Sequence, residues 1–326
     1  MIEKFKNYFL NLILIWVIIL LYRLLPYYKN FLRTETQIIL LSLALIYTTL
    51  GFVYYLFVLP EKIKETKGSQ IFNLLKKLLN CKTSKIDSKE KTAFLFVIVK
   101  IFFLPLMINF FLNNFFSLKN QLPNLNYFSA VSPTDAFNLI IFPLILTLIF
   151  FADTLWFTFG YTVETKFLKN KIRSVEPTIL GWVVALICYP PFNSIVTGKI
   201  NWYASEYVLF STTSITLIFR ILILLFLGIY VSASFALGAK CSNLTNRGIV
   251  SRGPYSIVRH PAYISKNIAW WITLIPVMSL PAILSMGTWT FIYHLRTITE
   301  EKHLMNDPEY QEYCKKVKYK YIPFIY

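Results

Sequence analysis

The sequence predicts an all-α, polytopic membrane protein with about six transmembrane spans, a C-terminal helical hairpin and both termini in the cytoplasm. Hydrophobic residues make up 56% of the 326 residues and charged residues only 15%, whereas soluble domains carry about 25% charged residues. The mean hydropathy is +0.54. Many of the apolar residues form runs that approach the roughly 20 residues a helix needs to cross the hydrocarbon core.

The net charge of +17 is compatible with a nucleic-acid binder or with a membrane protein that has basic loops. The basic residues lie between apolar runs, which is the pattern that the positive-inside rule produces. We therefore expect contacts with anionic membrane lipids and none with nucleic acid. The four cysteines are far apart, and no pair has the spacing of metal ligands, so no metal site is expected.

Apolar runs before residue 205 predict five spans. They are Tyr8–Tyr22 with the leucines that follow it, Gln37–Leu59, Thr92–Phe116, Ala136–Phe159 and Thr178–Tyr189. The fifth run ends at Pro190-Pro191, because proline lacks the N–H that continues a helix. Asp153 lies inside the fourth run. It is either a proton-relay or substrate residue, or a partner of Lys100 or Arg220.

The run Tyr207–Ala239 is too long for one span and contains Arg220. The simplest division places this arginine at the membrane interface. Ile221–Ala239 is then the sixth span, and Tyr207–Phe219 lies along the membrane surface or re-enters it. A continuous tilted helix is the alternative.

The run Ile264–Leu295 is also too long for one crossing, and "IPVMSLP" interrupts it near its middle. Because prolines break helices, we expect a tight helical hairpin here. The basic loops 61–91 and 161–176 and the segment after Lys240 fall on one side if the spans alternate, which places both termini in the cytoplasm. Within loop 61–91, "IFNLLKKLLN" has the spacing of an amphipathic surface helix.

We divide the chain into an N-terminal multi-span region, residues 1–205, and a membrane core, residues 206–326. The core contains "SRGPYSIVRHPAYISKN", residues 251–267, which concentrates Arg252, Arg259, His260 and Lys266 between apolar runs. Ionisable residues this close to a bilayer are costly and indicate a functional site. A basic loop that contacts lipid phosphates is the simpler alternative.

The segment "RTITEEKHL" follows the predicted hairpin. Arg296 and Glu300 are four residues apart and share one helix face, with Glu301 on the adjoining face. A surface ion pair would explain this spacing equally well. Farther along, Asp307-Pro308 predicts the end of this helix and the capped start of another.

Taken together, "GPYSIVRHPAY", a hairpin, "RTITEEKHL" and "DPEYQEYCKKVKYKYIPF" resemble the isoprenylcysteine carboxyl methyltransferase family and the related phospholipid methyltransferases. The resemblance covers roughly residues 237–324 and departs from the family at Ser265, where the family pattern has glycine. It implies an S-adenosylmethionine site on the cytoplasmic side, with Arg296 facing the acceptor. The cofactor-binding residues that it implies are Gly253, Tyr255, Arg259, His260, Tyr263, Glu300 and Glu301.

The side-chain types suit this cofactor. Arg259 and His260 can bind its carboxylate or ribose, and Glu300 its ammonium or ribose hydroxyls. The rings of Tyr255 and Tyr263 can face the adenine or the sulfonium cation. Tyrosines are also common in the aromatic belt at the membrane interface, which is the alternative explanation for both.

The sequence therefore predicts an integral membrane methyltransferase that acts on a lipophilic small-molecule or lipidated acceptor. Arg296 favours a carboxylate, as in an isoprenylcysteine, over an ethanolamine headgroup, because guanidinium binds carboxylate and repels ammonium. An NADPH-dependent sterol or isoprenoid reductase is one alternative. Another is a non-catalytic lipid-binding or transport protein, in which Asp153, Lys100 and Arg220 line a path.

Overall fold

The computed structural model describes residues 2–58, 65–80 and 86–325, and its regular secondary structure there is helical apart from one two-stranded ladder. The chain divides into two compact units, Met1–Leu112 and Asn113–Tyr326. Each unit is described by itself.

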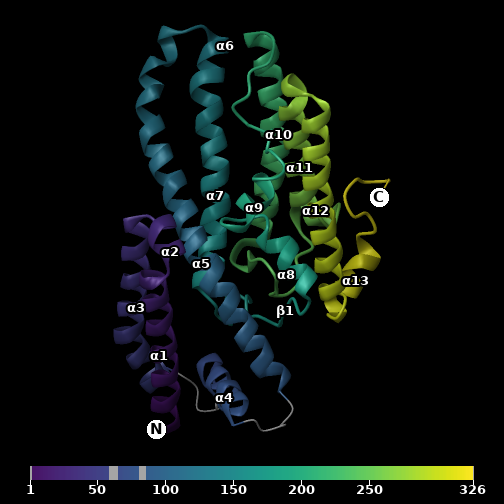
Figure 1. Ribbon diagram of the computed structural model, residues 1–326. Coiled ribbons are helices and arrows are strands. Elements are labelled where there is room, and N and C mark those ends of the chain that lie inside the picture. Colours follow the sequence, from purple (N-terminus) through teal and green to yellow (C-terminus); the bar gives the residue numbers. More distant parts are fainter. Residues whose placement is uncertain (1, 59–64, 81–85, 326) are drawn as a thin grey trace. The chain divides into compact units, whose positions relative to one another are not determined.

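The first unit is built from five helices within the described residues. They are α1 (Ile2–Leu24), α2 (Pro26–Phe31), α3 (Thr34–Val53), α4 (Lys67–Leu79) and the first part of α5 (Ser88–Gln121). Helices α1 and α3 lie side by side (Figure 1). Asn109 of α5 accepts hydrogen bonds from Arg33 N and Thr36 Oγ1, both at 2.8 Å, and so joins α5 to the start of α3.

Helix α4 confirms the amphipathic helix predicted within the basic loop. Ile71 and Leu74 are buried against the unit, whereas Leu78 and Leu79 are exposed. The Thr66 side chain caps its first turn, as hydroxyl residues commonly do. Residues 61–64 and 81–85 of the predicted loop lie outside the described residues.

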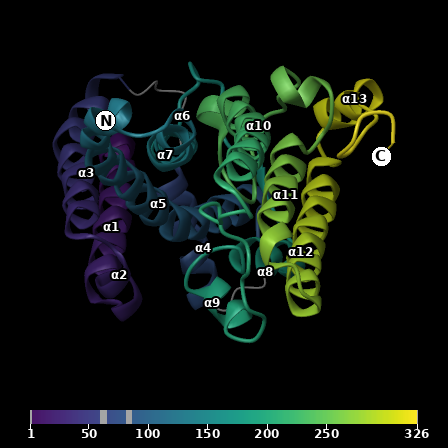
Figure 2. The ribbon, with the colours of Figure 1, turned by 90° about the horizontal axis from the view of Figure 1, so that it is seen from above.

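The second unit contains the remaining elements. Its helices are the end of α5, α6 (Pro133–Ala136), α7 (Phe142–Thr162), α8 (Ile179–Leu186), α9 (Phe192–Thr197), α10 (Thr213–Leu237), α11 (Pro261–Leu274), α12 (Leu280–Leu304) and α13 (Pro308–Lys316). The strands β1 (Ser174–Val175) and β2 (Thr245–Asn246) pair antiparallel, with Ser174 opposite Asn246. Helix α10 packs against α7 and α11, and α11 lies beside α12 in both views (Figures 1 and 2).

Apolar side chains of α7, α10 and α11 form the core that holds these helices together. Phe142 of α7, Ile223 and Leu227 of α10, and Ala269 of α11 are all at most 1% exposed. Because lipid chains are as apolar as these side chains, close van der Waals packing, rather than exclusion from water, holds the three helices together. The three helices therefore form a firm support for the loops at their ends.

In the described residues, five helical stretches are long and apolar enough to cross a membrane. They are Ile2–Leu24, Thr34–Val58, Ser88–Ala130, Pro133–Thr162 and Thr213–Lys240. The chain is thus a multi-pass membrane protein, but the prediction of about six spans is too high. The predicted span at Thr178–Tyr189 is wrong, because only Ile179–Leu186 is helical there, and eight residues rise only about 12 Å.

The division of residues 207–239 at Arg220 is also wrong. Thr213–Leu237 is one continuous helix, as the alternative proposed. Arg220 lies inside it and donates to the carbonyl oxygens of Asn138, at 2.5 Å, and Tyr207, at 3.4 Å. Its guanidinium also lies 4.6 Å from the centre of the Phe142 ring. These partners engage both terminal nitrogens of the guanidinium within the protein, whereas its buried Nε has no hydrogen-bond partner among the described residues.

The predicted hairpin is confirmed, with α11 and α12 joined by Ile275–Ser279. Trp271 Nε1 donates to Thr290 Oγ1 at 3.0 Å, and the rings of Trp270 and Tyr293 meet edge to face at 5.4 Å. The cytoplasmic position of the termini stays a prediction.

Candidate functional site

A pocket lies where α10 ends, α11 begins and α12 ends, and segment 240–250 forms another of its walls. Six of the eight predicted site residues line it, namely Tyr255, Arg259, His260, Tyr263, Arg296 and Glu300. Gly253 and Glu301 are not among the lining residues. The fold therefore brings together two motifs that are separated in sequence by the whole hairpin.

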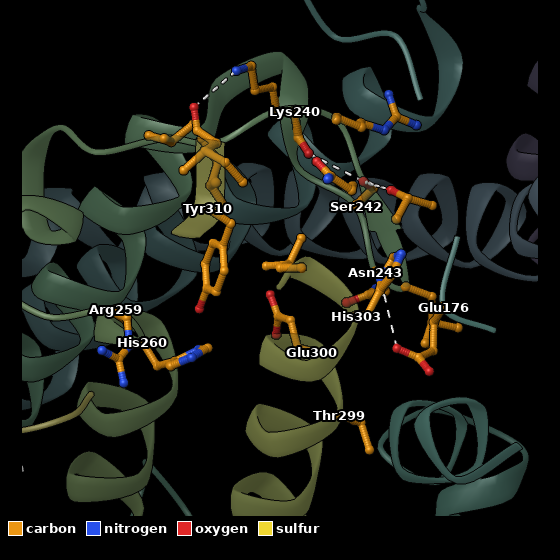
Figure 3. A pocket seen from close by; sticks show the side chains of 18 of the residues that line it. Glu176, Lys240, Ser242, Asn243, Arg259, His260, Thr299, Glu300, His303 and Tyr310 are labelled. Atoms are coloured by element: carbon orange, nitrogen blue, oxygen red, sulfur yellow. Dashed lines mark hydrogen bonds and ion pairs between the residues drawn. The ribbon is translucent and has the colours of Figure 1, made fainter. Parts of the chain in front are cut away.

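Glu300 extends from α12 into the middle of the pocket (Figure 3). The hydroxyl of Tyr263, on α11, donates to its Oε2 at 2.7 Å. This bond fixes the direction of the carboxylate and joins the two arms of the hairpin at the pocket. Glu300 is therefore placed to accept hydrogen bonds from a cationic or hydroxyl-bearing ligand.

Glu301 faces a cluster of nitrogen hydrogen-bond partners instead. Its Oε1 lies 2.8 Å from Arg259 Nε and 3.1 Å from His260 Nε2, and its Oε2 lies 2.8 Å from Lys320 Nζ. Burial alone would raise the pKa of Glu301, but the hydrogen bonds from these three partners outweigh it and lower the pKa to about 2. This cluster holds the His260 ring at the pocket wall.

The backbone strengthens the same connection. Arg259 N donates to Tyr319 O and His260 N to Lys320 O, both at 3.0 Å. The Arg259 guanidinium also donates to the carbonyl oxygens of residues 317 and 318. Residues 317–320 of the C-terminal tail thus hold Arg259 and His260, which precede α11, in place by hydrogen bonds.

Gly253 serves the site through its backbone. Its φ is +60°, a conformation that favours glycine. It begins the 3-10 turn Gly253–Ser256, which carries Tyr255 to the pocket. Tyr313 donates to Tyr255 O at 2.7 Å and fixes this turn from α13.

Ser265 is the position where the sequence departs from the family pattern. Its side chain is buried, and its hydroxyl donates to Pro261 O, one turn earlier in α11, at 2.7 Å. It does not line the pocket. The Ser265 hydroxyl therefore bonds to the backbone of its own helix.

Arg296 is a buried cation on the pocket wall. Its Nη2 donates to Asn243 Oδ1 at 2.5 Å. Its guanidinium carbon lies 5.3 Å from the centre of the Tyr263 ring and 5.9 Å from that of Tyr189. Within the described residues it has no carboxylate partner. Aromatic faces attract the guanidinium but leave its charge free to attract an anion.

Glu176 and His303 line the pocket and were missed in the sequence analysis. Ser174 Oγ lies 2.8 Å from His303 Nε2, and Glu176 Oε2 lies 3.8 Å from His303 Nδ1. The other Glu176 oxygen accepts from Thr178 N and Thr178 Oγ1. Burial lowers the pKa of His303, although Glu176 opposes the change. No motif marks Glu176, which lies far from His303 in sequence and reaches it through the β1–β2 pair.

Arg173 joins the β1 segment to the start of α13. Its Nη1 lies 2.9 Å from Asp307 Oδ2 and 2.7 Å from Glu309 Oε2. Asp307 also accepts from Asn246 of β2 at 2.7 Å and, as predicted, caps α13 by accepting from Glu309 N. The wall that carries Glu176 is thereby fixed to the helix that carries Tyr310 and Tyr313.

Asp153 lies outside this pocket. Its Oδ2 accepts from Tyr230 at 2.6 Å and its Oδ1 from Ser234 at 2.5 Å. The suggested pairing with Arg220 is therefore wrong, because Arg220 donates to two backbone carbonyl oxygens instead. The pairing with Lys100 stays a prediction. The two hydroxyl partners of Asp153 come from α10, which packs directly against α7.

These features define a multi-pass membrane protein with a pocket of mixed charge at the ends of its last helices. The family model described as phospholipid methyltransferase matches residues 207–310, which form a domain of that family and confirm the predicted resemblance. The match extends from just before α10 into α13, so it includes the hairpin and both pocket motifs. No curated protein and no solved structure matches the chain.

Proposed function

We propose that this protein is an S-adenosylmethionine-dependent membrane methyltransferase that methylates a carboxylate on a lipophilic acceptor. The family domain at residues 207–310 supports methyl transfer, since methyltransferases of this family use S-adenosylmethionine. The observation that carries the choice of acceptor is Arg296, a buried guanidinium with no carboxylate partner in the described residues.

The pocket residues fit the chemistry of the cofactor. Glu300, oriented by Tyr263, can accept hydrogen bonds from an ammonium group or from ribose hydroxyls. His260 and Arg259 can serve a carboxylate. Tyr255 offers a ring to the adenine or to a cation. When bound, S-adenosylmethionine supplies a methyl group on a sulfonium cation.

Glu301 and Gly253 act through their neighbours in this proposal. Glu301 positions His260 and Arg259 by its hydrogen bonds. Gly253 permits the turn that presents Tyr255. Both are positioning residues, which agrees with their absence from the pocket lining.

A carboxylate acceptor suits Arg296 for two reasons. The planar guanidinium binds a carboxylate through two parallel hydrogen bonds, whereas it repels an ammonium group. A carboxylate is also nucleophilic without losing a proton, so no general base is required. Holding the two reactants in line can supply about 7–11 kcal/mol of the lowering of the barrier.

The first test measures cofactor binding. The full chain is purified in detergent and titrated with labelled S-adenosylmethionine, beside Glu300→Gln and the control Glu312→Gln, which changes an exposed carboxylate of α13. We expect wild type and control to bind alike and Glu300→Gln to bind at least about tenfold more weakly, since the lost charged hydrogen bond contributes about 1.5–3 kcal/mol. Absent wild-type binding, or unchanged binding by Glu300→Gln, would contradict the proposal.

The second test identifies the acceptor group. Methyl label is transferred into a total membrane extract, and the labelled lipid fraction is treated with base. A methyl ester releases methanol, whereas an N-methyl group keeps its label. We expect base-labile product from wild type and little from Arg296→Met, with cofactor binding by the variant intact. Base-stable label would instead indicate an amine acceptor.

A further inference from the structure

Lys266 is a cation inside the helix bundle that the proposed chemistry does not use. It lies on α11 three residues after Tyr263, so the two side chains share a helix face. Its ammonium lies 4.8 Å from the centre of the Tyr230 ring, 5.2 Å from that of Trp270 and 5.7 Å from that of Phe150. Helices α7, α10 and α11 each supply one of these rings.

The surroundings of Lys266 offer rings but no direct acceptor. In the part of the chain that the structure describes, its ammonium makes no hydrogen bond and no ion pair. An ammonium group has three N–H donors, and a cation among membrane helices is costly unless it is paired. Cation–π contacts offset only part of this cost. Lys266 is half-buried, so its side chain is not sealed from a ligand.

The acidic groups near Lys266 do not contact its ammonium directly within the described residues. The acidic groups that act on it are Asp153 and Glu206, and Arg296 repels it; the Cys188 thiol is the other titratable neighbour. Asp153 is already committed, because each of its oxygens accepts a hydrogen bond from a hydroxyl. Arg296 has no carboxylate partner within the described residues. Asp153 is thus occupied by other donors, and neither Asp153 nor Glu206 forms an ion pair with Lys266 within the described residues.

We propose that Lys266 binds an anionic group of the acceptor, a phosphate or a carboxylate, between α7, α10 and α11. This inference rests on the proposed function and narrows the class of acceptor. Three residues of helix rise about 4.5 Å, so the anion would lie about that far beyond Tyr263 along α11, measured away from the pocket. The acceptor would then be an amphiphile with two polar groups, one held by Lys266 and one, the methyl acceptor, facing Arg296.

A lysine that serves packing alone would also fit between three rings, and Asp153 separates the two possibilities. If Lys266 binds an anionic ligand, Asp153 competes with that ligand, and Asp153→Asn should strengthen anion binding. If Lys266 serves only to balance Asp153, the same substitution should lower thermal stability and leave anion binding unchanged.

The experiment uses the full chain in a neutral maltoside detergent, with dodecyl phosphate and dodecanoate as anionic probes and dodecyltrimethylammonium as the cationic one. Binding is followed by the shift in melting temperature and by titration. We expect both anions, and not the cation, to stabilise the wild type. Lys266→Met should bind the anions at least about tenfold more weakly, Lys266→Arg should keep most of the affinity, and Lys315→Met, on the exposed face of α13, should behave as wild type.

The outcomes distinguish the sources of the anion. Tighter binding of dodecyl phosphate assigns a phosphate, and tighter binding of dodecanoate assigns a carboxylate. Equal anion binding by Lys266→Met and wild type overturns the proposal. If Lys266→Met does not fold, Lys266→Gln and Asp153→Asn give the same comparison. Binding of labelled S-adenosylmethionine is measured for every variant. A variant that loses anion binding and still binds the cofactor shows that Lys266 acts on the anion and not on the cofactor site. If the wild type does not bind S-adenosylmethionine, that result contradicts the proposed function and not the role of Lys266.

Discussion

Substituting Glu301→Gln removes a negative charge that contacts two cations and the His260 ring. Arg259, His260 and Lys320 each lie 2.8–3.1 Å from its carboxylate. The pKa of Glu301 is lowered from 4.5 to about 2. Each pKa unit corresponds to about 1.4 kcal/mol, so the charged form is favoured in the folded state by at most about 3.4 kcal/mol. Because solvent screens part of this interaction, we expect a loss of about 1–3 kcal/mol at pH 7.

The pH dependence of this loss has a definite sign. The pKa in the folded state lies below that in the unfolded state, so the stabilisation is fully present above pH 4.5 and disappears as the pH falls toward 2. About half of it should remain near pH 3.3. Melting temperatures of wild type and Glu301→Gln in detergent, measured from pH 7 to pH 3, should therefore converge.

The control is Glu312→Gln, because Glu312 is 63% exposed and, among the described residues, forms an ion pair only with Lys315 on its own helix. Its melting temperature should follow that of the wild type at every pH. A gap between wild type and Glu301→Gln that stays constant down to pH 3 would refute the reasoning, as would no gap at pH 7.

Two further predictions concern the packing at Gly160 and the titration of His303. A Cβ at Gly160 would lie 2.2 Å from Cys241 O, so Gly160→Ala should destabilise the protein by about 1–3 kcal/mol. Gly228→Ala, which meets no atom within 4 Å, should be neutral or slightly stabilising in the same thermal assay. Burial lowers the pKa of His303 below 6.5 despite the opposing effect of Glu176. Its contribution to stability is therefore present above pH 6.5 and is lost as the pH falls from 6.5 toward the folded-state pKa. His303→Asn should flatten this part of the pH–stability profile, and an unchanged profile would show that His303 is not the titrating group.

The sequence predicted the helical membrane class and the hairpin because both depend on local properties. Long apolar runs require membrane spans, and Pro276 and Pro281 mark the break between α11 and α12. Arg220 led to a wrong division of α10, because hydropathy assigns a cation to the interface. The carbonyl oxygens that accept hydrogen bonds from it belong to Asn138 and Tyr207, and only the folded chain shows that they are close.

The candidate site also contains residues that the sequence predicts and residues that only the structure reveals. Residues within recognisable motifs, such as His260 and Glu300, were predicted and do line the pocket. Glu176 was not predicted, because one carboxylate at the end of a basic loop carries no pattern. Its place in the wall depends on a two-residue β pairing and on Arg173, which holds that pairing to α13. Neither the short ladder nor the distant ion pair produces a periodicity in the sequence.

The pairing of β1 with β2 also limits how far the family domain can be treated as a module. The region that matches the family begins at residue 207, yet one wall of its pocket, with Glu176, comes from a segment more than thirty residues earlier. A fragment cut at the family boundary would keep both motifs and lose that wall. The unit that forms the pocket is thus larger than the recognisable domain, and transplanting the domain into another membrane protein would require the strand at 174–175 to be carried along.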